Sequence, residues 1–517
     1  MMARPYCVAL LLLAEVFGLG DGASNPGCVA RITRKGLDYA HQYGVAALQT
    51  ELSTIKLPDL SGSFEVGWIG SVSYEFTSLR IPSFKLQNSD LTLHPGQGVR
   101  ASLSNTYVSV RGNWKVQKSF ITLKGTFDLS VYRISISVSL KMNKDHYGRP
   151  TVSVAHCSNS IGHVSIDISG NLSWLLNLFH TRIESNIKNI LNQEICKMVR
   201  KSTTSYLKPY LQTLPVTLMI DQVAGIDYSL VGSPQVTSQD LDLPFKGEFF
   251  GRSQHSPVPF DAPSIRLPQK HEHMIYFAVS DYVFNTASWV YYQAGYMNFI
   301  FRNENIPQDA PFHLDTKSFG AVIPQLARSY PNMELELEVS PESAPFLTIS
   351  PRNVTLVPVM NIQAFVLLPN SFDRKTLFLL KARINISATI NVSSYRIVGS
   401  LTPGSKLKLE LKHSNVGSFN VELMEVILNF YTSKIIYPSI NAKLKEGFPL
   451  PLPKDTFFNS LEIQICEVSE KWGLGGLLQG WIHQGALNSQ LHHRPNFHRK
   501  LFFEFWCIMG EESSGGK

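Results

Sequence analysis

Two stretches in the N-terminal half repeat apolar residues at the three-and-four spacing of an amphipathic helix. The first runs from Val29 to Ile55. In the second, the spacing begins at Leu172, holds over 28 residues and stops before Pro209. A helix of that length is about 42 Å long. The pattern therefore predicts two long helices, each with one buried face.

The region between these helices alternates apolar and polar residues, as half-buried antiparallel strands do. Within residues 134–140 the apolar side chains occupy even-numbered positions, whereas within residues 127–131 they occupy odd-numbered positions. A strand that changes its buried face in this way needs a bulge or a bend. We therefore expect a distortion at Tyr132–Arg133.

Residues 241–270 contain five prolines. Proline lacks an amide hydrogen and favours extended backbone, so this stretch is not expected to join a central sheet. We interpret it as a linker between an N-terminal domain at residues 24–240 and a C-terminal domain at residues 271–466. Residues 467–517 are interpreted as a separate tail.

The same order of elements returns after the linker. Helical spacing recurs at residues 281–299 and 421–444, with alternating strand patterns between them. The first helices of the two halves start near residues 31 and 281, which lie 250 apart. The long helices start near residues 172 and 421, which lie 249 apart. These matching intervals indicate two structurally similar halves.

The first 23 residues have the pattern of a secretory signal peptide. Arg4 precedes the apolar run Val8–Leu13, and small residues follow at Gly20, Gly22 and Ala23. This run is too short for a transmembrane helix, and no later stretch reaches about 18 uninterrupted apolar residues. We therefore expect a protein that is secreted to the extracellular space. In such a protein the N-x-Ser/Thr sequons are candidate glycosylation sites. They lie at Asn171, Asn353, Asn385 and Asn391.

The chain has 517 residues, of which 44% are hydrophobic and 17% charged, which suits a large folded core and excludes a disordered chain. Its net charge is +7, and residues 24–240 carry 21 Lys and Arg against 14 Asp and Glu. Such an excess can steer an anionic lipid head group or an acidic glycan, although a chance surface excess explains it equally well. Dense Lys/Arg stripes are missing, which argues against a nucleic-acid partner.

Motifs of catalysis and metal binding are missing from the sequence: it has no Gly-x-Ser-x-Gly, His-Glu-x-x-His, phosphate-binding loop or dinucleotide fingerprint. His271-Glu272-His273 comes nearest to a metal site, but it lies beside prolines and lacks a third ligand, which favours a solvated linker. We expect no enzymatic activity, no metal and no cofactor. Five cysteines remain after removal of the signal, so an oxidising compartment favours a disulfide and leaves at least one cysteine without an intramolecular partner. They are Cys28, Cys157, Cys196, Cys466 and Cys507.

Each half thus combines apolar helices with a curved sheet. A long helix on a strongly curved sheet can enclose an elongated apolar cavity that holds acyl chains. The apolar faces can equally fill an ordinary core, and composition does not separate the two interpretations.

Several segments, in order along roughly residues 25–466, resemble a known family. In the N-terminal half they are Asn25–Tyr39, Gly112–Lys118, Leu178–His180, Ile183–Ser185 and Gln212–Val216. In the C-terminal half they are Lys246–Phe249, Ser280–Tyr282, Phe284–Ala287, Leu367–Ser371, Leu411–Gly417 and Gly447–Pro451. The family is that of bactericidal/permeability-increasing protein, lipopolysaccharide-binding protein and the plasma lipid transfer proteins. Within it, the chain most resembles the BPI fold-containing family C branch.

The resemblance implies an α+β boomerang of two similar domains. Each would be a strongly twisted antiparallel β-sheet or barrel with two amphipathic helices, and a central β-sheet would join them. It also implies a disulfide between Cys157 and Cys196, and an apolar phospholipid pocket in each domain. The pocket candidates on the helices are Ile32, Tyr39, Tyr43, Leu52, Leu176, Phe179, Ile183, Ile187, Ile190, Phe284, Val290, Met424 and Leu428.

The chain departs from the family at two places. Lipopolysaccharide-capturing members concentrate Lys and Arg at an N-terminal tip, whereas residues 56–80 of this chain contain only two bases. The neighbouring hairpin keeps four candidates for anionic head groups, at Arg111, Lys115, Lys118 and Lys124. The tail after Cys466 no longer resembles the family's closing strand, which would leave the central sheet without a partner there.

From these observations we expect a monomeric lipid-binding protein that holds phospholipid acyl chains and touches a membrane or micelle surface without spanning it. One alternative is an innate-immune protein that binds bacterial lipopolysaccharide. A second alternative is a structural or interaction protein that binds no lipid.

Overall fold

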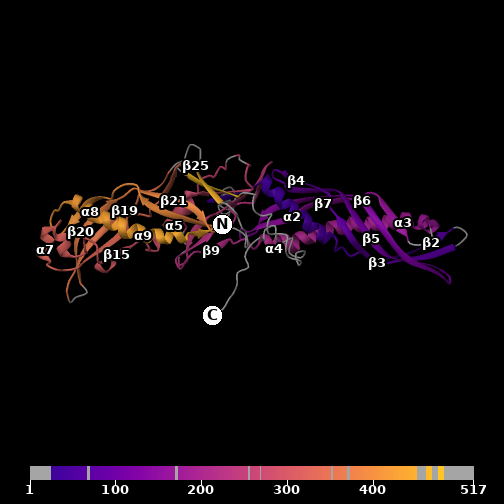
Figure 1. The fold of residues 1–517 in the computed structure, drawn as a ribbon, viewed down its shortest axis with the longest axis horizontal. Coiled ribbons are helices and arrows are strands. Elements are labelled where there is room, and N and C mark those ends of the chain that lie inside the picture. The colour runs from indigo at the N-terminus through magenta and orange to yellow at the C-terminus, as the bar shows by residue number, and fades with distance from the viewer. Residues whose placement is uncertain are drawn as a thin grey trace, which may run out of the picture.

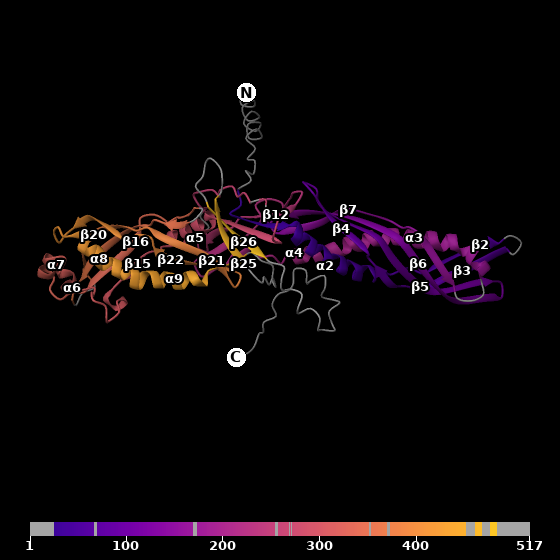
Figure 2. The same ribbon diagram turned by 45° about the horizontal axis from the view of Figure 1, so that its top comes forward.

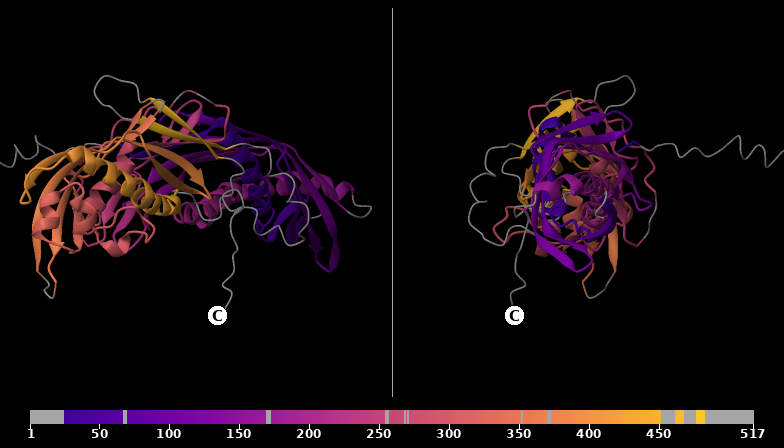
Figure 3. Two further views of the ribbon diagram at one scale, coloured as in Figure 1. Left: turned by 60° about the vertical axis from the view of Figure 1, so that its left-hand side comes forward. Right: turned by 90° about the vertical axis from the view of Figure 1, so that its right-hand side faces the viewer.

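The protein is elongated and bent, with its N-terminal half at one end and its C-terminal half at the other (Figures 1 and 3). This arrangement is seen in a computed structural model and confirms the expected α+β boomerang of two halves with a sheet between them. The structure describes residues 25–66, 70–168, 173–253, 257–267, 269, 271–350, 353–369, 373–450, 461–467 and 476–482. The expected signal peptide, residues 1–23, and the last part of the tail lie outside the described residues.

A seven-stranded antiparallel sheet forms the N-terminal half, in the order β2-β3-β5-β6-β7, with β4 beside β5 and β8 beside β6. The strands are β2 (Leu60–Val66), β3 (Gly70–Lys85), β4 (Asn88–His94), β5 (Gly98–Lys118), β6 (Ile121–Lys144), β7 (Pro150–Ser160) and β8 (Val164–Ile168). Along this order β2 and β7 are the two ends, so the sheet is open and the expected barrel form is corrected. Helices α2 (Arg34–Leu52) and α3 (Ser173–Ser202) run along this sheet (Figure 2).

The distortion expected in the longest strand is present. Arg133 has a backbone φ of 57°, a left-handed conformation that is unusual for a side chain of this size. On one side of it Leu129 and Val131 are buried, and on the other side Ile134 and Ile136 are buried. The bend therefore lets both parts of β6 face the same core, which confirms the prediction at Tyr132–Arg133.

The first predicted helix begins later than its pattern indicates. Cys28–Thr33 forms strand β1, which pairs with β12 (Asp240–Phe245) on one side and with β14 (Ile275–Ser280) on the other. Helix α2 follows only from Arg34. The apolar spacing of Val29 and Ile32 fits a helix, but ladders with two strands more than 200 residues away satisfy the backbone of this segment on both sides. The prediction of a helix from Val29 is therefore wrong for its first five residues.

The central sheet has the order β11-β12-β1-β14-β26-β25, with β11 at Gln235–Val236. Strand β12 contains Pro244, so the expectation that the proline-rich stretch stays out of a central sheet is wrong at its start. Pro244 lies opposite Val29, yet its carbonyl accepts a hydrogen bond from Val231 on the other side, at 3.0 Å. The amide position of Pro244 therefore also faces away from β1, and the β1–β12 ladder loses no hydrogen bond.

The tail contributes to the same sheet. Strand β25 (Leu461–Glu467) pairs with β26 (Gly476–Ile482), and β26 pairs with β14. Figure 2 shows both strands in the middle of the molecule. The expectation that the central sheet lacks a partner at this edge is corrected, because residues 476–482 supply one.

Two five-stranded antiparallel sheets form most of the C-terminal half, in the orders β15-β16-β19-β20-β23 and β17-β18-β21-β22-β24, and a three-stranded sheet in the order β13-β10-β9 is built from residues 217–251. The first contains β15 (Phe299–Phe301), β16 (Leu335–Pro341), β19 (Val359–Leu367), β20 (Arg374–Arg383) and β23 (Lys408–Ser414). The second contains β17 (Leu347–Ser350), β18 (Asn353–Leu356), β21 (Ile386–Ser393), β22 (Arg396–Pro403) and β24 (Phe448–Pro449). The third contains β9 (Thr217–Met219), β10 (Ala224–Asp227) and β13 (Glu248–Gly251).

The first helix of the C-terminal half is shorter than predicted. Helix α5 (Asp281–Gln293) ends in a turn in which Gly295 adopts a φ of 73°, and β15 then begins at Phe299. The aromatic residues of the predicted helical stretch thus divide between a helix and a strand. Two short helices follow, α6 (Thr316–Gly320) and α7 (Pro324–Ser329).

Both long helices contain a π turn just before a proline. In the N-terminal half α3 continues through a π turn at Thr203–Leu207 into α4 (Lys208–Leu211). In the C-terminal half α8 (Val421–Tyr431) continues through a π turn at Thr432–Ile436 into α9 (Tyr437–Glu446). Each turn starts with a threonine whose hydroxyl donates to the carbonyl four residues earlier.

The first long helix was predicted to stop before Pro209, but it continues past this proline. The π turns explain why. Proline removes an amide donor and its ring crowds the preceding turn of an α-helix. A π turn is wider than an α turn and relieves this crowding. The backbone amide of the residue before each proline donates to the carbonyl five residues earlier, from Lys208 to Thr203 and from Tyr437 to Thr432. The same device in both halves confirms that the two halves are structurally similar.

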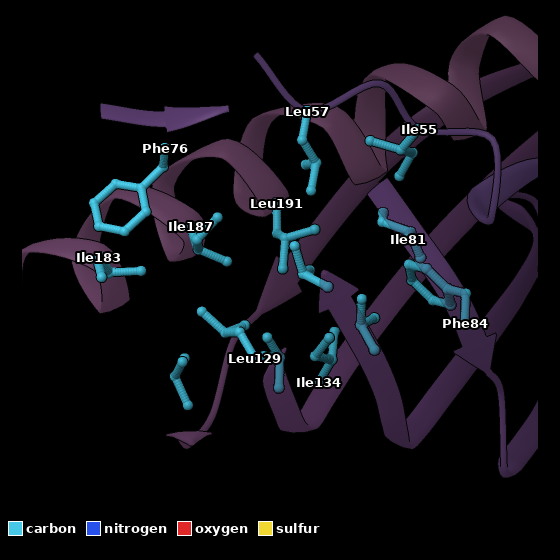
Figure 4. Close-up of a cluster of buried hydrophobic side chains, with 14 of the residues drawn as sticks. Ile55, Leu57, Phe76, Ile81, Phe84, Leu129, Ile134, Ile183, Ile187 and Leu191 are labelled. Carbon is cyan, nitrogen blue, oxygen red and sulfur yellow. The ribbon is translucent and has the colours of Figure 1, made fainter. Parts of the chain in front are cut away.

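The apolar core forms separate clusters in the two halves. In the N-terminal half, side chains of α3 such as Ile183, Ile187 and Leu191 face strand residues such as Phe76 and Leu129 (Figure 4). A second cluster lies under α8 in the outer C-terminal half, and a third surrounds α5 and the central sheet.

Candidate functional site

The outer end of the N-terminal sheet carries an exposed apolar turn. Strands β5 and β6 are joined by the two residues Ser119 and Phe120, and Ser119 has a φ of 50°. The side chain of Phe120 is 94% exposed and that of Ile121 is 55% exposed. The first residues of β3 lie at the same end, because Ser73 of β3 pairs with Gln117 of β5 (Figure 1). We call residues 115–124 the tip hairpin.

The tip hairpin is anchored by its inward-facing side chains. Trp114 and Val116 of β5 are 3% and 6% exposed and belong to the N-terminal core. Gly125 of β6 leaves room for the indole, since a Cβ atom there would lie 2.8 Å from Nε1 of Trp114. The alternation of β5 and β6 therefore holds the outward-facing side chains of the hairpin in place.

Three of the four basic residues proposed for anionic head groups, Arg111, Lys115 and Lys124, lie on the outer face of the sheet at or near this hairpin, whereas Lys118 pairs with Ile121 on the inner face, at the end of the hairpin. Arg111 donates to Asp128 at 2.6 Å, and Lys115 lies 3.4 Å from Glu75. Within the described part of the chain, Lys118 and Lys124 have no carboxylate partner. Two of the four predicted cations are thus unpaired as far as the described residues go, and they lie on either side of Phe120 and Ile121 in the sequence.

Sequence reasoning missed Phe120. The signal was available as an apolar pair, Phe120-Ile121, placed between lysines where two alternating strands meet. A turn normally carries polar or glycine residues, so an exposed phenylalanine at this position is unusual. An apolar apex with unpaired lysines behind it can enter a lipid surface while its charges meet anionic head groups.

The pocket candidates of the N-terminal half do not all belong to one cluster of side chains. Leu52, Ile183 and Ile187 belong to one buried cluster, and Ile190 packs against it. Tyr39 and Tyr43 are half-buried, with their hydroxyls 3.1 Å apart, and burial raises the pKa of Tyr39. The other candidates are Ile32, which lies on β1 of the central sheet instead of a helix, and Leu176 and Phe179 of α3, whose side chains lie outside the described residues.

In the C-terminal half the candidates fall into two clusters. Phe284 and Val290 of α5 pack near the central sheet. Met424 and Leu428 of α8 lie in the outer cluster. The four candidates of the C-terminal half therefore do not belong to one buried cluster.

A groove with a volume of about 490 Å³ opens beside the small sheet β13-β10-β9. Its wall includes Lys246, which lies 2.9 Å from Glu248 and 3.6 Å from Asp227. Tyr282 donates to the other oxygen of Glu248 at 2.5 Å. The lining combines this ion-paired cluster with Met219, Phe250 and Pro257, so it is less uniformly apolar than a site that holds an acyl chain.

The disulfide between Cys157 and Cys196 is present and ties β7 to α3. Cys28 is a buried free thiol, and burial raises its pKa. Of the sequons, Asn385 and Asn391 are exposed. Asn353 lies on β18 but its side chain is not described, and Asn171 lies outside the described residues. The side chain of Cys466 and the whole of Cys507 also lie outside the described part of the chain.

Two further sequence expectations concern metals and membranes. His271 does not approach a metal cluster; its Nδ1 lies 3.1 Å from Asp240 Oδ1. No group of three or more potential metal ligands occurs among the described side chains. Within the described residues, no helix combines the length and the apolar character that crossing a bilayer requires.

Several known proteins match the chain along most of its length. Human lipopolysaccharide-binding protein is 51% identical over 458 residues, which cover 89% of this chain and 94% of that protein. Rat bactericidal permeability-increasing protein is 38% identical over 446 residues, with coverages of 86% and 92%. A crystal structure of lipopolysaccharide binding protein matches with a TM-score of 0.60 at 46% identity, covering 89% of this chain and 99% of that one.

The expected nearness to the family C branch is corrected by the same comparison. Human BPI fold-containing family C protein is only 29% identical over 469 residues, covering 90% of this chain and 91% of that protein. The resemblance to the family as a whole is confirmed domain by domain. The N-terminal domain of the LBP / BPI / CETP family matches residues 36–214, and its C-terminal domain matches residues 218–473. The chain belongs to the LBP / BPI / CETP family.

Proposed function

We propose that this protein is a secreted, non-enzymatic binding protein that recognises bacterial lipopolysaccharide through the tip hairpin. The observation that carries the proposal is the apex of Phe120 and Ile121 between two lysines without carboxylate partners in the described part of the chain. The names of the relatives support it, since lipopolysaccharide-binding proteins match along nearly the whole chain. Secretion rests on the N-terminal signal pattern and agrees with the disulfide, which forms in oxidising compartments.

The mechanism divides between charge and apolar contact. Lipopolysaccharide carries phosphates next to acyl chains. Lys118 and Lys124 would meet the phosphates, and Phe120 would enter the acyl layer beside them. A base near an anionic lipid surface contributes about 1 kcal/mol. Arg111 and Lys115 contribute less, because Asp128 and Glu75 already neutralise much of their charge.

Replacing both unpaired lysines, in the variant Lys118→Ala plus Lys124→Ala, is expected to weaken binding to lipopolysaccharide aggregates about 30-fold. This factor corresponds to a loss of about 2 kcal/mol, or about 1 kcal/mol per base. The dissociation constant of the full-length protein, measured by titration at several salt concentrations, checks the prediction. The variant should also show a smaller salt dependence, because fewer charges meet the surface.

The matched control is Lys443→Ala plus Lys445→Ala. These lysines are exposed on α9, so the control removes the same charge at a distance from the tip. The proposal fails if both double variants bind as the unaltered protein does, or if the unaltered protein does not bind lipopolysaccharide.

A second candidate function is the holding of phospholipid acyl chains. It is favoured by the apolar layer between α3 and the N-terminal sheet, where Ile183, Ile187 and Leu191 are at most 2% exposed (Figure 4). Under this function the layer would open to admit acyl chains, and the protein would act as a monomer that exchanges lipid with a micelle or membrane surface.

Native mass spectrometry of gently purified protein is expected to show added masses of phospholipid, at up to one lipid for each half. Uptake of a fluorescent acyl lipid by delipidated protein provides the second measurement. Protein that carries no lipid and takes up none would contradict this candidate and would favour a core filled by side chains alone.

A further inference from the structure

The turn between β6 and β7, residues 145–149, is a rigid loop at the opposite end of β6 from the tip hairpin. Asp145 Oδ1 accepts the amide hydrogens of Tyr147 and Arg149, each at 2.9 Å. Asp145 also donates its own amide to the carbonyl of Arg149, at 2.9 Å. Gly148 completes the turn with a φ of 76°, which a residue with a side chain adopts only at a cost.

The loop is also fixed to a neighbouring segment. The carbonyl of Gly148 accepts a hydrogen bond from the amide of Leu230 at 2.8 Å. A Cβ atom at Gly148 would lie 2.5 Å from Cβ of Ser229, so glycine is required for this close approach. Lys144 adds two hydrogen bonds to the carbonyls of Leu230 and Val231, at 3.1 and 2.9 Å. The loop is thus held before any ligand arrives.

This loop presents aromatic and basic side chains together. Tyr147 is 61% exposed. The imidazole of His146 lies 3.8 Å from its ring centre, and the guanidinium carbon of Arg149 lies 5.5 Å from it. Such a cluster of ring, hydroxyl and guanidinium offers several hydrogen-bond donors beside an apolar surface.

In the part of the chain that the structure describes, no carboxylate pairs with the basic side chains of the loop. Among the residues that the structure describes, neither Lys144 nor Arg149 has an ion-pair partner. The Nε–H of Arg149 meets no acceptor in that part of the chain. Asp145 is the single carboxylate of the loop, and its Oδ1 is occupied by two amides. The loop therefore presents a local excess of positive charge.

We propose that residues 144–149 form a binding site for a sugar chain that carries phosphate or sulfate groups. The guanidinium of Arg149 would bind the anionic group, because its planar donors match phosphate and sulfate oxygens. The ring and hydroxyl of Tyr147 would contact the sugar. This assignment gives a location to the acidic glycan that the positive charge of residues 24–240 allows as a partner.

The site is separate from the lipid-binding tip. Strand β6 has 24 residues between the two turns, which at about 3.3 Å per residue places them on the order of 80 Å apart along the strand. Only the bacterial source of the sugar rests on the proposed function: a phosphorylated core oligosaccharide would come from lipopolysaccharide, whereas a sulfated glycan would come from a host surface.

The test measures binding of the full-length protein to three lipid-free probes by calorimetry. They are a phosphorylated core oligosaccharide, the same oligosaccharide after phosphatase treatment, and a sulfated tetrasaccharide. Arg149→Gln should weaken binding of the anionic probes about tenfold, the usual effect of losing one charge-assisted hydrogen bond. Tyr147→Ala should weaken it by a similar factor. Arg149→Gln keeps the backbone amide that Asp145 accepts, so the loop should remain folded.

Two controls separate this site from other effects. Tyr132→Ala removes another exposed tyrosine, 43% exposed, from the same sheet and should leave binding unchanged. The variant Lys118→Ala plus Lys124→Ala should bind lipopolysaccharide aggregates more weakly but bind the lipid-free probes normally. A failure of the proposed function at the tip hairpin is therefore distinguishable from a failure of this site. Binding of the phosphorylated probe alone assigns a bacterial source, and binding of the sulfated probe alone a host source. The proposal is overturned if the unaltered protein binds neither anionic probe, or if both loop variants bind these probes as tightly as the unaltered protein does. It is also overturned if the sulfated probe does not bind and the oligosaccharide binds equally well before and after phosphatase treatment.

Discussion

Replacing Arg31 by alanine is expected to lower the free energy of unfolding by about 3–5 kcal/mol, because it leaves buried carboxylates without their cation. Arg31 lies on β1 and is 6% exposed. Its Nε and Nη2 each donate to Asp242 of β12 at 2.7 Å, and Asp240 lies 3.7 Å away with a side chain only 2% exposed. Urea unfolding followed by tryptophan fluorescence measures the change.

Arg111→Ala is the matched control for this prediction. Its ion pair with Asp128 also joins two neighbouring strands at 2.6 Å, but both side chains are about half exposed. Solvent screens such a pair, so its loss is expected to change the free energy of unfolding by at most about 1 kcal/mol. Equal losses in the two variants would show that burial does not set the strength of these ion pairs.

The Arg31→Ala variant should also respond to pH in a defined direction. Burial raises the pKa of Asp240, while Arg31 and His271 oppose that rise. Without Arg31 the pKa rises further above its value in the unfolded chain. The folded variant then binds more protons than the unfolded chain, so its deficit should be smallest near pH 4 and grow as pH rises toward 7. A deficit that does not depend on pH would indicate lost packing instead of an uncompensated carboxylate.

Removing the disulfide, in the variant Cys157→Ala plus Cys196→Ala, is expected to lower the free energy of unfolding by about 2–4 kcal/mol. The two cysteines are 39 residues apart, and a loop of that size gives about 4 kcal/mol when only the entropy of the unfolded chain is counted. Because the bond ties β7 to α3, we expect the N-terminal half to unfold earlier than the C-terminal half. Thermal unfolding by calorimetry checks both statements.

Reduction of the disulfide provides the control. The N-terminal half of the unaltered protein in dithiothreitol should unfold at the temperature of the double variant, and this transition of the variant should not respond to the reductant. A variant as stable as the oxidised protein would show that packing of α3 on the sheet already holds the two elements together.

The long helices and the bend in β6 could be predicted because their signals are local. Three-and-four spacing marks the buried face of α3 whatever it packs against, and it also predicted the helix at residues 421–444, which is α8 and α9 with a π turn between them. The bend follows from a change in the phase of alternation at Tyr132–Arg133. The similarity of the halves followed from the spacing of these helices along the chain.

The central sheet could not be predicted in this way. The spacing of Val29 and Ile32 suits a helix, but β1 lies between β12 and β14, strands that begin more than 200 residues further along the chain. Pro244 is acceptable in β12 only because its amide position faces away from β1, and that orientation depends on the pairing register. Likewise, no pattern in the tail shows that Gly476–Ile482 pairs with β14.

The features of the candidate site likewise divide into those that local sequence shows and those that depend on strand pairing. From the sequence one can read which residues are basic, which helices are amphipathic and to which family the chain is similar. It takes the strand register to see that Glu75 and Asp128 neutralise Lys115 and Arg111, that Lys118 and Lys124 stay unpaired among the described residues, and that Phe120 is exposed. The physical reason is that periodicity reports one side chain's own preference for burial, whereas charge compensation and exposure depend on neighbours that strand register brings from elsewhere in the chain.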